Sequence, residues 1–137
     1  VHGLNFNTHD RSHLLRASQE GIVFALRYGI DIMTEMGLPV DTVRAGHANM
    51  FMSPLFREAF ATITNTTVEL IETDGAEGAA RGAGLGAGVY DAPTDAFSGL
   101  ERITTIEPSR DKAAAYTEAY DRWCDLLDHE LARMKDA

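Results

Sequence analysis

Apolar residues recur at three- and four-residue spacing near the start of the chain. This spacing places side chains along one side of an α-helix. Asp10 is a good cap for the start of this helix, and Gly37 with Pro39 ends it. Gly21 and Gly29 each weaken a helix by about 1 kcal/mol relative to alanine, so we expect another backbone to lie close to both. The predicted apolar stripe consists of Leu15, Ser18, Ile22, Ala25, Leu26, Gly29, Ile32, Met33 and Met36.

A strand, a tight turn, a helix and a second strand are predicted next. Residues 42–45 are interpreted as a buried strand, and residues 67–72 as a second strand because of their β-branched content. Between them, Ser53 caps a helix with Pro54 at its first position, where the missing N–H costs nothing. Two strands joined by a helix form a right-handed βαβ unit with parallel strands. The inner face of the helix is expected to consist of Leu55, Phe56, Ala59, Phe60 and Ile63.

The rest of the chain is predicted to be mainly helical. In residues 75–90, glycine and alanine recur every four residues, which predicts a helix whose small side chains allow close packing against a neighbour. A phosphate-binding glycine loop is the alternative, although the segment lacks both GxGxxG and a P-loop lysine. Thr94 is expected to cap one short turn, Arg102–Ile106 to be extended, and Ser109 to cap the last helix. The apolar side of that helix is predicted to contain Ala113, Tyr116, Tyr120, Trp123, Leu127 and Leu131.

Composition narrows the class of protein. A chain of 137 residues fits one domain with a real core. The net charge of −9 argues against nucleic acid or an anionic membrane as the main partner, since both would repel it. One cysteine cannot form an internal disulfide, and the sequence contains neither an apolar run of membrane-spanning length nor a leader pattern. We therefore expect a cytoplasmic protein, and the start at Val1 suggests a fragment of something longer.

The turn at residues 46–49 is the strongest candidate for a ligand site. It directly follows a strand, precedes a helix, and has small residues around it. Ligands of α/β sheets bind beyond the carboxyl ends of the strands, where backbone N–H groups can face phosphate or ribose. The alternative is an ordinary βα loop, in which His47 and Asn49 are satisfied loop polar groups.

Other reactive side chains favour structural roles. His9 and His13 have the spacing of a helical metal pair, but spacing identifies no third ligand, and a polar helix start is the favoured interpretation. Cys124 lies next to Trp123 on an amphipathic helix and is interpreted as a core residue. Arg16 and Glu20, four residues apart, are expected to form a surface ion pair.

Four motifs, in order along the chain, resemble one family. Residues 7–22 resemble the H-x-R-x-H-L-x-R-A-x-x-E-G-I segment of the FGGY family of carbohydrate kinases. Residues 53–58 resemble its S-P-L-W-R-Q helix start, and residues 74–84 its E-x-x-A-x-G-A-A-x-x-A-G helix. Pro108, followed by two tyrosines, resembles its carboxyl-terminal tail. Each motif is weak alone, but together they are specific and cover nearly the whole chain.

The resemblance implies an α/β fold and a role in binding nucleotide. The fold would be part of an actin-like, ribonuclease-H-like ATPase lobe: a long helix, a βαβ unit, a small-residue helix and a C-terminal helix. Residues 1–137 would be the C-terminal part of the family's C-terminal domain, forming the adenosine-side wall of an ATP site. The implied nucleotide-binding residues are Ala45, Gly46, His47, Ala48 and Asn49, with Glu20 as a further candidate. The family's turn is richer in glycine than Ala45-Gly46-His47, and residues 50–52 are a short insertion relative to it.

The implied activity belongs to a longer parent protein. That parent would be an ATP-dependent kinase of a ketose, D-xylulose first, with Mg²⁺ accompanying the nucleotide. The family's N-terminal lobe supplies the catalytic base and most sugar contacts, so no catalytic residue is assigned to this chain, and homo-oligomer formation stays open.

Two alternatives also stay open. The chain could be a regulatory or scaffold remnant that does not bind nucleotide, or a different α/β enzyme using metal chemistry at His9 and His13.

Overall fold

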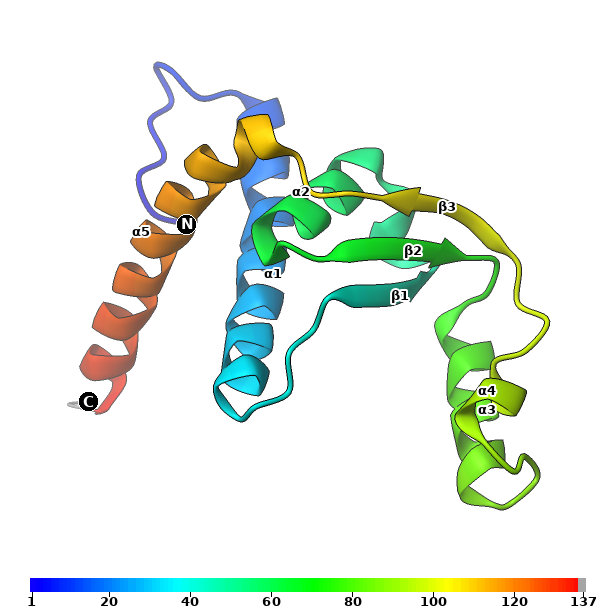
Figure 1. Cartoon of the computed structure of the whole chain (residues 1–137). Helices are drawn as coiled ribbons and strands as arrows, with labels where there is room; N and C mark the ends of the chain where they lie inside the picture. The colour runs from blue at the N-terminus through cyan, green and yellow to red at the C-terminus, as the bar shows by residue number, and fades with distance from the viewer. Residues whose placement is uncertain (136–137) are drawn as a thin grey trace.

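The computed structural model describes residues 1–135, which form helices and a small sheet (Figure 1). The order along the chain is α1 (Arg11–Glu35), β1 (Thr42–Gly46), the 3-10 turn η1 (Asn49–Met52), α2 (Pro54–Thr64), β2 (Thr67–Ile71), α3 (Gly75–Gly86), α4 (Pro93–Ala96), β3 (Arg102–Ile106) and α5 (Arg110–Lys135). The predicted mixed α/β architecture is confirmed. No helix within the described residues is long and apolar enough to cross a membrane.

Helix α1 begins and ends where the sequence predicts. The Asp10 side chain accepts hydrogen bonds from the backbone N–H groups of Ser12 and His13, and Gly37 ends the helix with a φ of 83°. The close approach expected at Gly21 and Gly29 is wrong, because a Cβ built on either glycine meets nothing within 4 Å. Residues of the predicted apolar stripe lie on a surface of α1 that no other described element covers.

The βαβ unit forms as predicted. Strands β1 and β2 are parallel, with Thr42 opposite Thr67 and Gly46 opposite Ile71. The Ser53 hydroxyl accepts the Phe56 N–H at the start of α2, and Pro54 occupies its first turn. The predicted burial of the first strand is wrong for most of its length: only Ala45 is buried, because β1 is the edge of the sheet.

Strand β3 completes a three-stranded sheet in the order β1-β2-β3. It runs antiparallel to β2, and the register shifts between Leu70 and Ile71. The extended conformation expected for Arg102–Ile106 is confirmed.

Helices α3 and α4 extend away from the sheet (Figure 1). Helix α3 ends at Gly86, earlier than residue 90, and contains no buried residue. The close packing predicted against a neighbouring helix or sheet is wrong for Gly78, Gly82 and Gly86, which have nothing within 4 Å of a built Cβ. At Gly84 a built Cβ would lie 2.7 Å from the Tyr90 ring, which follows α3 in the chain. Helix α4 begins after Ala92 without a side-chain cap, so the predicted cap at Thr94 is also wrong.

The core lies around α2, which contacts α1, α5 and the sheet. Four of the five residues predicted for its inner face are buried, and Leu55 is half-buried. Tyr116 and Tyr120 of α5 are also buried, whereas Leu131 near its end is exposed. The buried cluster consists of Val23, Phe24, Ala45, Phe56, Ala59, Phe60, Ala61, Ile63, Val68, Tyr116 and Tyr120.

Candidate functional site

The turn after β1 lies on the surface at the carboxyl end of the parallel strand pair. Ala45 is buried at the end of β1, Ala48 is half-buried, and the side chains of His47 and Asn49 are exposed. Asn49 has a φ of 50°, a left-handed conformation that asparagine tolerates better than most residues. The turn therefore presents a small side chain and two polar side chains to an approaching ligand.

Hydrogen bonds within the chain hold this turn in place. The His47 N–H donates to the Ile71 carbonyl at 2.9 Å, and the Ala48 N–H donates to the Gly46 carbonyl at 2.8 Å. Both N–H groups are thus paired with backbone carbonyls of the chain. The exposed polar side chains of the turn are those of His47 and Asn49.

The chain leaves no room for a side chain at position 46. A Cβ built at this position would lie 2.6 Å from the carbonyl oxygen of Thr73, the second residue after β2. The carboxyl ends of β1 and β2 are thus in direct contact.

The β2–α3 junction adjoins the turn, and the sequence interpretation missed it. Asp74 caps α3 by accepting the Glu77 N–H at 2.8 Å. The Thr73 hydroxyl donates to the Glu77 carboxylate at 2.8 Å, and Arg81 donates to the same carboxylate. These contacts hold the pKa of Glu77 below its usual value, with the Thr73 hydroxyl as the larger cause. The signal was available in the sequence, because the predicted parallel pairing places the residues after both strands at one edge.

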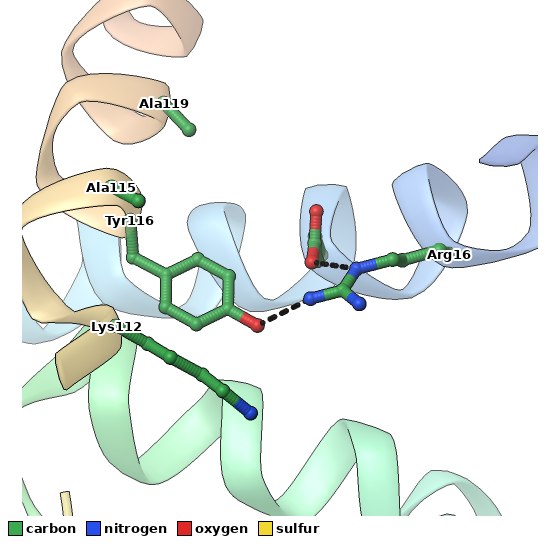
Figure 2. Close-up of a pocket in the computed structure, with 6 residues that line it drawn as sticks. Arg16, Lys112, Ala115, Tyr116 and Ala119 are labelled. Carbon is green, nitrogen blue, oxygen red and sulfur yellow. Dashed lines mark hydrogen bonds and ion pairs between the residues drawn. The ribbon is translucent and has the colours of Figure 1, made fainter. Parts of the chain in front are cut away.

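Glu20 lies in a different environment, a hollow of about 260 Å³ between α1 and α5. Its carboxylate accepts from the Arg16 Nε at 2.7 Å, and the Arg16 Nη2 donates to the Tyr116 hydroxyl at 3.2 Å (Figure 2). The predicted Arg16–Glu20 ion pair is confirmed. Burial raises the pKa of the Tyr116 phenol, and the charge of Glu20 raises it further. Lys112 lines the same hollow.

Gln19, the residue before Glu20, connects α1 to the start of α2, which follows the turn. The Ser53 hydroxyl, at the start of α2, donates to the Gln19 side-chain oxygen at 2.9 Å. Ala45, Gly46, His47, Ala48 and Asn49 are therefore brought together at the end of β1, and Glu20 faces the hollow beside α5.

The histidine pair takes part in the start of α1. The rings of His9 and His13 are 5.5 Å apart, and the His13 Nδ1 lies 2.8 Å from the Asp10 carboxylate that caps the helix. Within residues 1–135, no group of three His, Cys, Asp or Glu side chains is placed to hold a metal ion. Cys124 is half-buried and packs against the core, as predicted.

The fold places this chain among the actin-like ATPases. A solved xylulose kinase from Brucella ovis superposes with a TM-score of 0.78 at 30% identity, over 96% of this chain and 27% of that chain. A glycerol kinase from Plasmodium falciparum, solved with ADP, superposes with a TM-score of 0.66 at 25% identity, over 93% of this chain and 26% of that chain.

Sequence comparison identifies the family. Residues 1–90 match the C-terminal domain of the FGGY family of carbohydrate kinases. An L-xylulose/3-keto-L-gulonate kinase from Escherichia coli is 31% identical over 126 residues, which are 87% of this chain and 24% of that protein. The chain belongs to the FGGY family of carbohydrate kinases. It spans about a quarter of the length of the curated relatives that it matches.

Proposed function

We propose that this chain forms the adenosine-side wall of the ATP site in a cytoplasmic, ATP-dependent carbohydrate kinase. The substrate would be a ketose, with D-xylulose the first candidate. Support for the reaction class comes from the family, and support for a ketose comes from relatives named for xylulose. The glycerol kinase solved with ADP supports the nucleotide.

The observation that carries this proposal is the exposed turn at the carboxyl end of β1. Residues 46–49 follow β1 at the edge where α/β sheets hold ligands, and His47 and Asn49 are exposed there. The small residues Gly46 and Ala48 would let the adenosine approach the backbone, whereas Ala45 is buried at the end of β1. Asn49 is proposed to contact the base or ribose, and His47 to lie beside the ring. Glu20 remains a weaker candidate, because it is paired with Arg16 in the hollow beside α5.

ATP supplies the phosphoryl group, and Mg²⁺ is expected to reach the site with the nucleotide. The residues of this chain would bind and orient the adenosine only. The catalytic base and most sugar contacts are proposed to belong to the rest of the parent protein.

Titration with ADP, followed through backbone amide NMR shifts, tests the proposal. We expect weak, saturable binding with the largest shifts at residues 45–49. Replacing Asn49 by glycine removes the side chain without backbone strain, because glycine accepts a positive φ. This variant should weaken ADP binding several-fold.

The matched control is Asn65→Gly. Asn65 has nearly the same φ, 53°, but ends α2 rather than preceding it. If both variants weakened ADP binding equally, we would attribute the effect to lost stability and not to a lost contact with ADP. Absence of binding at millimolar ADP would favour the alternative, a remnant of the same fold without nucleotide. Metal found in purified protein would favour the histidine alternative.

A further inference from the structure

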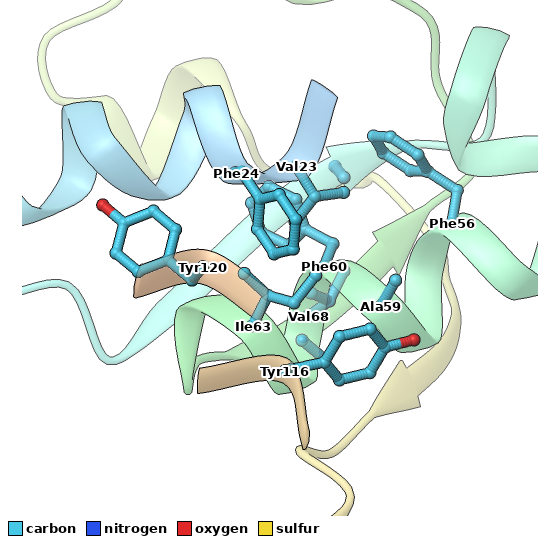
Figure 3. Packing of buried hydrophobic residues seen from close by; sticks show 11 residues of the cluster. Val23, Phe24, Phe56, Ala59, Phe60, Ile63, Val68, Tyr116 and Tyr120 are labelled. Carbon is cyan, nitrogen blue, oxygen red and sulfur yellow. The ribbon is translucent and has the colours of Figure 1, made fainter. Parts of the chain in front are cut away.

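The core holds the two parallel strands but does not extend to the helix that follows β2. Figure 3 shows Val68 of β2 in the buried cluster with Phe60 and Ile63 of α2. Ala45 is buried at the end of β1. Helix α3, by contrast, contains no buried residue. The position of the segment between β2 and α3 therefore depends on polar contacts more than on core packing.

One backbone carbonyl ties this segment to the turn after β1. The Ile71 carbonyl accepts both the His47 N–H and the Thr73 N–H, each at 2.9 Å. A second contact is steric, because the Thr73 carbonyl oxygen occupies the space beside Gly46 that a Cβ would need. A shift of Thr73 would therefore alter the contacts that place the turn at residues 46–49.

Two charged side chains of α3 hold Thr73 in its place. The Thr73 hydroxyl donates to one carboxylate oxygen of Glu77 at 2.8 Å. The other oxygen of that carboxylate accepts from the Arg81 Nε at 3.0 Å and from its Nη2 at 2.9 Å. These hydrogen bonds form a continuous chain of contacts from Arg81 through Glu77 and Thr73 to the turn.

Arg81 is anchored more firmly than an ordinary surface arginine. An exposed Glu–Arg pair four residues apart on a helix contributes little by itself. The Arg81 side chain, however, is only 23% exposed. Its Nη1 donates to the Ala96 carbonyl at 2.7 Å and to the Ser98 carbonyl at 3.3 Å. Ala96 is fully buried at the end of α4, so a second element fixes the guanidinium that holds Glu77.

We propose that Arg81 is a positioning residue for the turn at residues 46–49 and acts through Glu77 and Thr73. In this role Arg81 does not contact the nucleotide; it fixes the shape of the surface that the nucleotide meets. The effect on nucleotide binding rests on the proposed function, whereas the effect on the turn does not.

The test replaces Arg81 by methionine, which keeps an unbranched side chain and removes every hydrogen-bond donor. In the absence of ADP, we expect the His47 N–H to exchange with solvent about fivefold faster, the effect of losing one net hydrogen bond. The Ile63 N–H, which reports on the core, should change clearly less because the opening is local. ADP should bind about fivefold more weakly, for the same reason.

Arg122→Met is the matched control, since Arg122 of α5 also pairs with a glutamate four residues earlier, Glu118. It should change neither quantity. A second variant, Thr73→Val, removes the hydroxyl at nearly the same side-chain shape and should reproduce the effect of Arg81→Met. Because both residues act in one chain of contacts, the double variant should weaken ADP binding no more than either single variant does.

Three outcomes would overturn the proposal. The first is unchanged exchange at His47 in Arg81→Met. The second is an equal rise at His47 and Ile63, which would mark a loss of overall stability. The third is a double variant whose loss of ADP binding is the sum of the two single losses, because the two residues would then act independently. Absence of ADP binding by the unchanged protein would refute the proposed function instead, and the exchange rates would still decide the role of Arg81.

Discussion

At the scale of single residues, Gly46 shows how one small side chain can be required for two reasons. A glycine in the turn lets a ligand approach the backbone, which is the role that the family resemblance implies. The structure adds a reason within the chain, since the Thr73 carbonyl oxygen occupies the space that a Cβ would need. If a substitution at position 46 abolished ligand binding, that result would have two explanations: a blocked approach of the ligand to the backbone, and the clash with the Thr73 carbonyl.

Replacing Gly46 by alanine is expected to destabilise the protein by about 1–3 kcal/mol, the usual cost of forcing extra volume into a packed site. Urea unfolding measures the change. Gly82→Ala is the control, because nothing lies within 4 Å of a Cβ built there and alanine favours the helix interior by about 0.5–1 kcal/mol. A Gly46→Ala variant as stable as the original protein would show that the contact with Thr73 relaxes easily.

At the scale of elements, the sheet is held together by charge as well as by backbone pairing. Glu69 of β2 accepts a hydrogen bond from Arg44 of β1 and another from Arg102 of β3, each at 2.8 Å. One carboxylate thus connects all three strands. Arg44 is the larger cause, and Arg102 the second, of a Glu69 pKa below its ordinary value of 4.5.

The lowered pKa of Glu69 predicts a pH-dependent contribution to stability. A depressed carboxyl pKa stabilises the fold above the unfolded-state value, and this contribution is lost as the pH falls through the folded-state value. The original protein should therefore be more stable than Glu69→Gln at neutral pH, and the difference should shrink in acid below pH 4.5.

Urea unfolding of both proteins across this pH range checks the expectation. Glu35→Gln, at the exposed end of α1, controls for the loss of one negative charge. A difference between the original protein and Glu69→Gln that persists unchanged into strong acid would contradict the assigned role of the two arginines.

At the scale of the whole molecule, we expect the proposed reaction to need more than this chain contains. Phosphoryl transfer depends on positioning and on charge stabilisation around the transferred group. The chain spans about a quarter of its curated relatives. The residues assigned here lie on one proposed wall of the site, and none of them is a catalytic base.

We expect the 137-residue chain alone to show no kinase activity with ATP, Mg²⁺ and D-xylulose. A coupled assay of ADP formation measures it, with a complete xylulose kinase as the positive control and heat-treated protein as the background. Turnover clearly above that background, abolished by Asn49→Gly but not by Asn65→Gly, would show that the chain holds a full active site.

Local chemistry made several elements predictable. Asp10 and Ser53 predict helix starts because a side-chain oxygen can accept hydrogen bonds from the free N–H groups of the first turn. Gly37 predicts a helix end because glycine readily adopts a left-handed conformation. The parallel strand pair followed from two β-branched runs joined by a helix. The glycine spacing in α3 predicted a helix correctly, but not what would lie beside it.

By itself, the sequence determined the order and type of the main elements, the family, and the position of the turn after β1. These depend on neighbours along the chain and on motifs that can be recognised without coordinates. Only the tertiary structure decided which face of α1 is covered, why Gly46 is small, and that Glu20 faces α5. Those features arise from contacts between residues far apart in the chain. A side chain is buried only where another element packs against it, and the sequence near that side chain does not show which element does so.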